Sequence, residues 1–279
     1  MKIFNIETGK FKADGGAMFG VVPKQIWKKK YSCDEDNLCS ISNRSLLIDT
    51  GNRKVLIDAG IGNKQDEKWL SFHHLHGDDT LLKSLKNVGY TPDDITDVVL
   101  THLHWDHCGG ALSKNYDGQI GLQFLNAKVW VSADQWEWAT NPNIREAPAY
   151  PQENIIPLAE YGNVEFVTEN KEIIPGIHVR LFNGHTKGLM LPVLQTENGT
   201  VFFAGDLIPV MANIPLVYIA SYDVFPMDTL DEKEKLLTEA FANNWTLVFQ
   251  HDAYSQACTL KETPKGIRED VVLDVNDID

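Results

Sequence analysis

The chain has 279 residues, a formal net charge of −14 and 43% hydrophobic residues. This length suffices for one large domain or two small ones with an ample core. The acidic balance argues against bulk electrostatic attraction to nucleic acid or to an anionic membrane. The local basic run Lys28–Lys30 is expected to be a solvated face. Four cysteines without a Cys-x-x-Cys pair, no apolar leader and no apolar stretch long enough to span a membrane predict a reduced, cytoplasmic protein.

The beginning of the chain is predicted to be rich in strands, at residues 2–7, 44–49 and 54–58. The last two flank Thr50-Gly51-Asn52-Arg53, which is typical of a hairpin turn. Between the first and second strands, the glycines of residues 14–23 permit a loop. The apolar side chains of this loop are Met18, Phe19, Val21 and Val22. They either pack against the rest of the protein or line a cleft.

A histidine-rich stretch follows, with His73, His74 and His76 between elements. We interpret these three histidines as parts of a solvated loop, with a role at the rim of a cleft as the alternative. A helix that begins near Asp78-Asp79 is predicted to end near Val88, because Gly89 stops it. A short helical turn is expected at residues 91–94.

The most informative stretch is Thr-His-Leu-His-Trp-Asp-His-Cys-Gly-Gly, residues 101–110, directly after the apolar run Val98-Val99-Leu100. Such a run predicts a buried strand that delivers a loop. The loop carries three histidines and an aspartate within six residues, and imidazole and carboxylate suit zinc and similar divalent metals. Small-residue packing is expected for Cys108. The candidate metal ligands here are His102, His104, Asp106 and His107.

The second half is predicted to be mixed. Strands are expected at 128–132, 164–167, 177–182, 189–197, 200–204 and 246–249, and helices at 133–140 and 228–244. The Pro-rich, aromatic connection 141–157 is of the kind that often carries function. Three further ligand-type residues each stand at or just after the end of an apolar run, namely His185, Asp206 and His251.

His-x-His-x-Asp-His after a strand and before Gly-Gly resembles the signature of the metallo-β-lactamase superfamily of hydrolases. The order and separations of the downstream residues match that family across almost the whole chain. The resemblance implies an α/β (α+β) fold, an αββα sandwich of two mixed β-sheets flanked by helices. It also implies one domain over residues 1–279, because no linker divides the chain.

The resemblance further implies two divalent metal ions per chain. Zinc is the expected metal, and the same ligands accept manganese, iron or cobalt. His104 argues against the diiron oxygen-reducing branch, in which a glutamate stands at that place. One ion would be held by His102, His104 and His185, the other by Asp106, His107 and His251, with Asp206 bridging both. Asp58, at the end of the strand 54–58, would be an outer partner of the metal site, with a simple turn aspartate as the alternative.

A dinuclear centre can supply a metal-bridging hydroxide as the nucleophile at neutral pH. Asp106 and Asp206 would then be the catalytic carboxylates, and the protein would be a metal-dependent hydrolase of a small-molecule substrate. Residues 14–23 resemble the N-terminal segment of the quorum-quenching N-acyl-homoserine lactone lactonases, where it borders the substrate cleft. Opening of a lactone or ester is therefore the expected reaction. The candidate cleft residues are Met18, Phe19, Val21, Val22, Tyr222 and Phe225.

The sequence also departs from that branch. Asn183-Gly184-His185-Thr186-Lys187-Gly188 lacks the proline before, and the second histidine after, that many relatives carry. Pro209 stands where the best-known lactonases place a substrate-binding tyrosine, so Tyr222 or the second metal would have to replace it.

Alternatives remain at this stage. Another branch of the family would cleave a thioester, a β-lactam or a phosphodiester, and a non-catalytic metal-binding domain is a further possibility. No nucleic-acid or membrane partner is expected, and a homodimer is left open.

Overall fold

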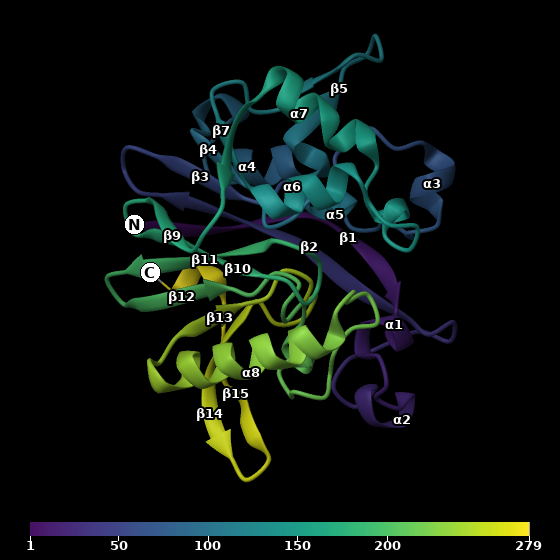
Figure 1. Ribbon diagram of the computed structural model, residues 1–279, viewed down its shortest axis with the longest axis vertical. Coiled ribbons are helices and arrows are strands. Elements are labelled where there is room, and N and C mark those ends of the chain that lie inside the picture. The colour runs from purple at the N-terminus through teal and green to yellow at the C-terminus, as the bar shows by residue number, and fades with distance from the viewer. Residues whose placement is uncertain (279) are drawn as a thin grey trace. The chain divides into compact units, whose positions relative to one another are not determined.

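The computed structural model describes residues 1–278, and the chain divides into two compact units (Figure 1). Unit 1 comprises Met1–Gly9 and Asn43–Asn170, and unit 2 comprises Lys10–Ser42 and Lys171–Asp279. Two long strands, β1 (Lys2–Asp14) and β2 (Leu38–Asp49), carry the chain from one unit to the other. The prediction of a single domain over the whole chain stays a prediction.

Unit 1 is built on a six-stranded sheet in the order β1-β2-β3-β4-β7-β8. The strands β3, β4, β7 and β8 run parallel, whereas β2 and β3 form an antiparallel hairpin. Parallel strands are normally covered on both faces, and β4 is buried along its whole length. The four strands span Lys54–Ile57 (β3), Asp97–Val99 (β4), Lys128–Ser132 (β7) and Asn163–Val167 (β8).

The core of unit 1 forms where three helices cover alternate residues of these strands. The helices α4 (Leu81–Asn87), α6 (Ala133–Thr140) and α7 (Ile156–Tyr161) each contribute apolar side chains to one cluster with the sheet. Shorter elements complete the unit: α3 (Glu67–Ser71), α5 (Trp105–Cys108), β5 (Leu112–Lys114), β6 (Ile120–Leu122) and the 3₁₀ turns η1 (Pro92–Asp94), η2 (Gly109–Ala111), η3 (Ala147–Ala149) and η4 (Gln152–Asn154).

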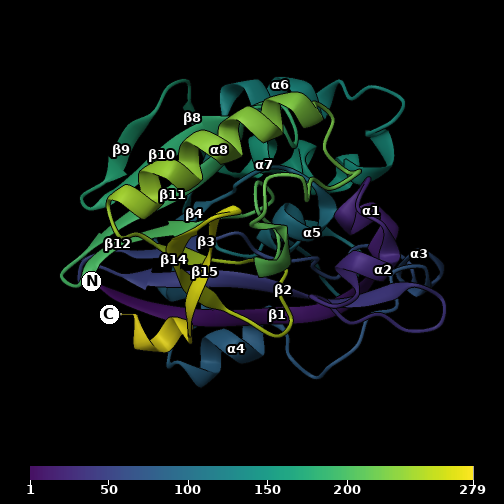
Figure 2. The same cartoon turned by 90° about the horizontal axis from the view of Figure 1, so that it is seen from below.

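Unit 2 contains a seven-stranded sheet in the order β15-β14-β13-β12-β11-β10-β9, which is antiparallel except for the pair β12 and β13. The long helix α8 (Pro226–Ala242) lies along this sheet (Figure 2) and buries Leu236, Leu237 and Ala240 against it. The strands span Lys171–Ile174 (β9), Ile177–Phe182 (β10), Leu189–Thr196 (β11), Gly199–Phe203 (β12), Thr246–Val248 (β13), Ala257–Thr263 (β14) and Gly266–Leu273 (β15). Unit 2 also holds α1 (Gly15–Phe19), α2 (Lys24–Trp27), η5 (Met211–Asn213) and η6 (Val275–Asp277).

Most predicted elements are confirmed. The strands 128–132 and 177–182 and the helix 133–140 have the predicted bounds. Each unit contains one large sheet with its covering helices, and the α/β fold class is confirmed. No helix of the described residues combines the length and the apolar character needed to cross a membrane.

The expected loop at residues 14–23 is wrong in part, because α1 begins there. The Asp14 carboxylate accepts hydrogen bonds from the N–H groups of Gly16 and Ala17, as an N-cap does. Trp27 lies where a Cβ on Gly15 would have to go, 2.2 Å away, so only glycine fits. The helix predicted to begin near Asp78-Asp79 is α4, and it is capped by Thr80 rather than by that pair.

The strand that delivers the histidine motif is fixed at its beginning by the buried carboxylate of Asp97. That carboxylate accepts hydrogen bonds from Nε of Arg53 (2.7 Å), Nε1 of Trp130 (2.9 Å) and Oγ1 of Thr96 (2.7 Å), and it also pairs with Arg53 Nη2. Asp97 is completely buried. Its removal would leave several donors without an acceptor, which is costly inside a protein.

We therefore expect Asp97→Asn to lower the free energy of unfolding by about 2–3 kcal/mol, since the amide replaces an acceptor by a donor that faces Arg53. Urea unfolding would measure this as a lower midpoint with an unchanged slope. The matched control is Asp93→Asn, at an exposed position of η1, which should change stability by less than about 0.5 kcal/mol. Equal stability of the two variants would contradict the role assigned to Asp97.

Candidate metal centre

The histidine motif of unit 1 is held in a tight bend between β4 and β5. The carbonyl of His107 accepts the N–H of Ala59, and the N–H of Gly110 donates to the carbonyl of Gly60. A Cβ on Gly109 would lie 1.9 Å from the Ile61 carbonyl oxygen, and one on Gly110 would lie 2.0 Å from that of Ala59. The Gly-Gly pair is therefore needed because two backbone segments approach each other here.

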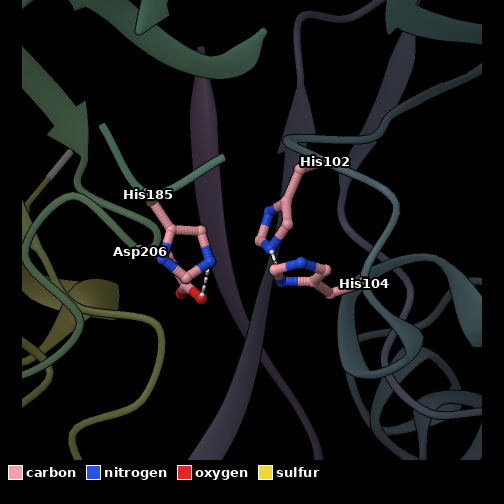
Figure 3. A group of neighbouring side chains, drawn as sticks. All are labelled: His102, His104, His185 and Asp206. Carbon is pink, nitrogen blue, oxygen red and sulfur yellow. Dashed lines mark hydrogen bonds and ion pairs between the residues drawn. The ribbon is translucent and has the colours of Figure 1, made fainter. Parts of the chain in front are cut away.

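The first two histidines of the motif point at one place. Nε2 of His102 lies 2.9 Å from Nδ1 of His104, and both residues are buried (Figure 3). The rings are nearly perpendicular, with centroids 4.4 Å apart. The other nitrogen of His102, Nδ1, lies 3.1 Å from Oγ1 of Thr101. Two ring nitrogens converging in a buried position are suited to binding one metal ion.

Asp58 holds the last histidine of the motif. Its carboxylate accepts hydrogen bonds from the N–H and the hydroxyl of Thr101, at 2.7 and 2.8 Å, and lies 2.9 Å from Nδ1 of His107. Asp58 is completely buried and has a φ of 57°, a conformation that aspartate and asparagine tolerate better than most residues. Nε2 of His107 lies 3.6 Å from Oδ2 of Asp106. The contact expected of an outer partner is thus present, while its role in metal binding stays a prediction.

In unit 2, His185 follows β10, and its ring lies between two carboxylates. Oδ1 of Asp223 lies 2.8 Å from Nδ1, and Oδ2 of Asp206 lies 3.1 Å from Nε2 (Figure 3). Burial alone would lower the pKa of His185, but the two carboxylates outweigh it and raise the pKa to about 10. The surroundings of this ring therefore favour a positive charge.

Asp206 also reaches a second histidine. Its Oδ1 lies 2.9 Å from Nε2 of His251, so the two carboxylate oxygens face two different imidazoles. His251 comes just after β13, and its Nδ1 lies 2.9 Å from the carbonyl oxygen of Ser42. The backbone N–H of His251 donates to the carbonyl of Pro209 at 3.0 Å. The carbonyl of Pro209 therefore helps to hold the backbone of His251 in place.

These residues fit a divalent metal by their chemistry. Three rings, those of His107, His185 and His251, have Nδ1 fixed by a carboxylate or a carbonyl. Metal-ligating histidines typically have this outer hydrogen bond, which orients the ring and presents the other nitrogen. The described residues that could hold a metal ion are His102, His104, Asp106 and His107 in unit 1 and His185, Asp206 and His251 in unit 2.

The predicted cleft residues differ in how far their side chains are exposed to solvent. Phe19 is completely buried and stacks on Trp27 with ring centroids 5.0 Å apart, next to Tyr31 and Tyr218. Phe19 therefore packs in the core of unit 2 rather than presenting a wall. Met18 and Val22 are also buried, whereas Val21 is 92% exposed.

The two remaining cleft candidates lie before and at the beginning of α8. Tyr222 is 47% exposed, and Phe225 is half-buried with Nζ of Lys187 5.9 Å from its ring centroid. These side chains are available for contact with a ligand, and their part in a cleft stays a prediction.

Sequence reasoning missed Asp223 and Glu146. Asp223 is 38 residues from His185, and no local pattern marks it as that ring's partner. Glu146, in the connection predicted to carry function, is buried and lies 4.0 Å from Nε2 of His104. It accepts hydrogen bonds from Trp138 and Asn143 at 2.8 and 2.6 Å. For Glu146, the only signal in the sequence was an acidic residue in an aromatic loop.

Comparison with known proteins places the histidine motif within a family. Residues 42–113 match the metallo-β-lactamase superfamily. The N-acyl homoserine lactonase of Bacillus thuringiensis is 29% identical over 163 residues, and the match covers 58% of this chain and 58% of the lactonase. The match thus spans little more than half of that relative's length.

Solved structures extend the likeness to the whole chain. A probable metal-dependent hydrolase from Staphylococcus aureus is 30% identical with a TM-score of 0.88, covering 98% of this chain and 96% of that one. AidC, a dizinc quorum-quenching lactonase solved with its product, has a TM-score of 0.80 over 98% of this chain and 95% of its own, but at 21% identity this likeness shows the fold alone. By its motif, its fold and this full-length relative, the chain belongs to the metallo-β-lactamase superfamily.

Proposed function

We propose that the protein is a dinuclear metal-dependent hydrolase that opens a lactone or a related ester. The observation that carries the proposal is the carboxylate of Asp206, whose two oxygens face His185 at 3.1 Å and His251 at 2.9 Å. A carboxylate that faces two imidazoles, each with its other nitrogen fixed, supports a ligand shared by two cations.

In the proposed centre, His102, His104 and His185 would hold one divalent ion, and Asp106, His107 and His251 would hold the other. Asp206 would serve both ions. This assignment is supported by the order of the ligands in the sequence and by the pairing of motif side chains within unit 1. Zinc is the metal we propose, because imidazole and carboxylate together suit it, although manganese, iron and cobalt accept the same ligands.

Two such cations, when bound, lower the pKa of a shared water to about 7 and polarise the carbonyl under attack. The chain's own residues supply the geometry for that chemistry. Asp58, Asp223 and the Ser42 carbonyl orient three ligand rings. Asp106 and Asp206 would supply the negative charge that holds the cations, and Asp206 would serve both positions.

A lactone is the favoured substrate because the curated relatives include N-acyl homoserine lactonases from Bacillus. Thioester, β-lactam and phosphodiester hydrolysis are the competing activities within the superfamily. A hydrolysis panel on zinc-loaded protein would decide among them, with acyl-homoserine lactones of several lengths, a simple lactone, an aryl ester, a thioester, a cephalosporin and a phosphodiester. Faster cleavage of the phosphodiester than of any lactone would overturn the assignment.

We expect the loaded wild type to hold about two metal ions per chain, and Asp206→Ala to lose more metal than any other single ligand substitution, because only Asp206 serves both positions. Elemental analysis after gel filtration would measure this. Asp231→Ala, an exposed change on α8, is the control and should keep the wild-type content. A wild type that is fully active with one tightly bound ion would rule out the dinuclear centre.

Asp58→Asn should weaken metal retention about 10–100-fold while leaving the protein folded, because the amide no longer offers His107 a charged acceptor. Asparagine is a cleaner substitution than alanine, since it tolerates the φ of 57°. Competition with a chelator would measure the affinity, with the exposed turn variant Asp117→Asn as the control. An affinity equal to that of the wild type would reduce Asp58 to a turn residue.

Catalytic efficiency should rise with the length of the acyl tail, about fourfold for each CH₂ buried at about 0.8 kcal/mol. Val21→Ser should flatten this rise with metal content intact, because Val21 is the exposed member of its segment. Val271→Ser, on the edge strand β15, is the matched control and should keep the slope. Phe19→Ala is unsuitable, because emptying a buried aromatic site costs about 3–5 kcal/mol of stability. A rate independent of tail length would argue against an acyl-binding cleft.

A further inference from the structure

The loop that carries His185 is held by a carboxylate from the helix α8. Here the N–H of Asn183 donates to Oε1 of Glu232 at 2.7 Å, and the N–H of Gly184 donates to Oε2 of the same carboxylate at 3.0 Å. Both oxygens of Glu232 are thus committed to the backbone of one loop.

Glu232 lies on α8, which is packed directly against this loop. A Cβ on Gly184 would lie 2.4 Å from the backbone nitrogen of Thr229, one turn before Glu232 on the helix. The carbonyls of Gly184 and His185 accept the N–H groups of Phe225 and Val224, at 2.9 and 3.0 Å. The segment 223–232 therefore contacts the loop through both its side chains and its backbone.

These contacts end at the ring of His185. Asp223, at the beginning of the same segment, fixes Nδ1 of His185 at 2.8 Å. The orientation of the ring thus depends on the position of the loop relative to α8, which Glu232 sets through two hydrogen bonds. The side chain of Asn183 closes the loop from the other end, because its Oδ1 accepts the N–H of Gly188 at 3.1 Å.

We propose that Glu232 is a positioning residue for the ligand His185, and that the backbone N–H of Asn183 and the carboxylate of Glu232 form a matched pair of donor and acceptor. The inference rests on the proposed function only in treating His185 as a metal ligand. The hydrogen-bonded pair itself makes a prediction that needs no metal.

The first test is a double-mutant cycle. Asn183→Pro removes the N–H that donates to Oε1 of Glu232. In the wild-type background this change should lower the free energy of unfolding more than it does in the Glu232→Gln background. The reason is that the amide group of Glu232→Gln no longer needs that donor. Asn183→Ala keeps the N–H and removes only the side-chain acceptor of Gly188, so it separates the two contributions of this residue. Additive effects of Asn183→Pro and Glu232→Gln would overturn the matched pair.

The second test follows the loop and the ligand. In Glu232→Gln, amide hydrogen exchange over residues 183–188 should become about tenfold faster. Zinc affinity, measured by competition with a chelator, should fall about tenfold, at the lower end of the range for outer partners. The control is Glu234→Gln, an exposed position on the same helix, which should change neither quantity.

The outcomes separate this inference from the proposed function. If the loop amides of Glu232→Gln exchange at the wild-type rate and the variant binds zinc with the wild-type affinity, Glu232 does not position His185. That result would leave the proposed dinuclear hydrolase unaffected. If the wild type binds none of zinc, manganese, iron and cobalt, the proposed function fails, and the ligand-positioning role fails with it. In that case non-additive stabilities in the cycle would still support the pairing of Asn183 with Glu232.

Discussion

The arrangement depends on fixing imidazole rings through the nitrogen that a metal would not use. Asp58 fixes His107 in unit 1, and Asp223 and the Ser42 carbonyl fix His185 and His251 in unit 2. Each anchor is itself buried or part of the backbone, so rotation of a ring would leave a polar group without a partner. A ring held in this way can present Nε2 in one direction without losing further side-chain entropy when a cation binds.

Each unit also contains a buried lysine that donates hydrogen bonds to two backbone carbonyls. Lys64 donates from Nζ to the carbonyls of Gly109 and Leu112, directly after the histidine motif. Lys233, on α8, donates to the carbonyls of Pro215 and Tyr218 at 2.9 and 3.0 Å. Burial lowers the pKa of Lys64 to about 8 and that of Lys233 to about 7. Each lysine thus supplies donors to backbone carbonyls inside the protein, where a polar group needs a partner.

The sequence predicted what depends on local pattern. The strand β7 (Lys128–Ser132) and the helix α6 (Ala133–Thr140) are adjacent, and their apolar spacing and the Ser132 cap are visible in the sequence. The residues of the histidine motif could likewise be found, because three histidines and an aspartate, all ligand-type side chains, lie within six positions. The hairpin of β14 and β15 was missed, since its β15 strand is largely exposed and lacks a clear apolar alternation. The helical start of α1 was also missed, because it depends on Asp14 as a cap and on the contact between Gly15 and Trp27.

The two carboxylates that contact the His185 loop could not be predicted, for a physical reason. Asp223 and Glu232 act on the His185 loop across 38 and 48 residues of sequence, and only the packing of α8 brings them there. A single sequence contains no periodicity that encodes such a contact. Likewise, only the packed structure distinguishes the buried Phe19 from the exposed Val21 beside it.

The central claim is that Asp206 is shared by two metal ions. Anomalous diffraction from crystals of the zinc-loaded protein, recorded on both sides of the zinc absorption edge, tests it most directly. The account predicts two anomalous peaks, with one carboxylate oxygen of Asp206 bound to each. A single peak, or two peaks with Asp206 bound to only one of them, would contradict it.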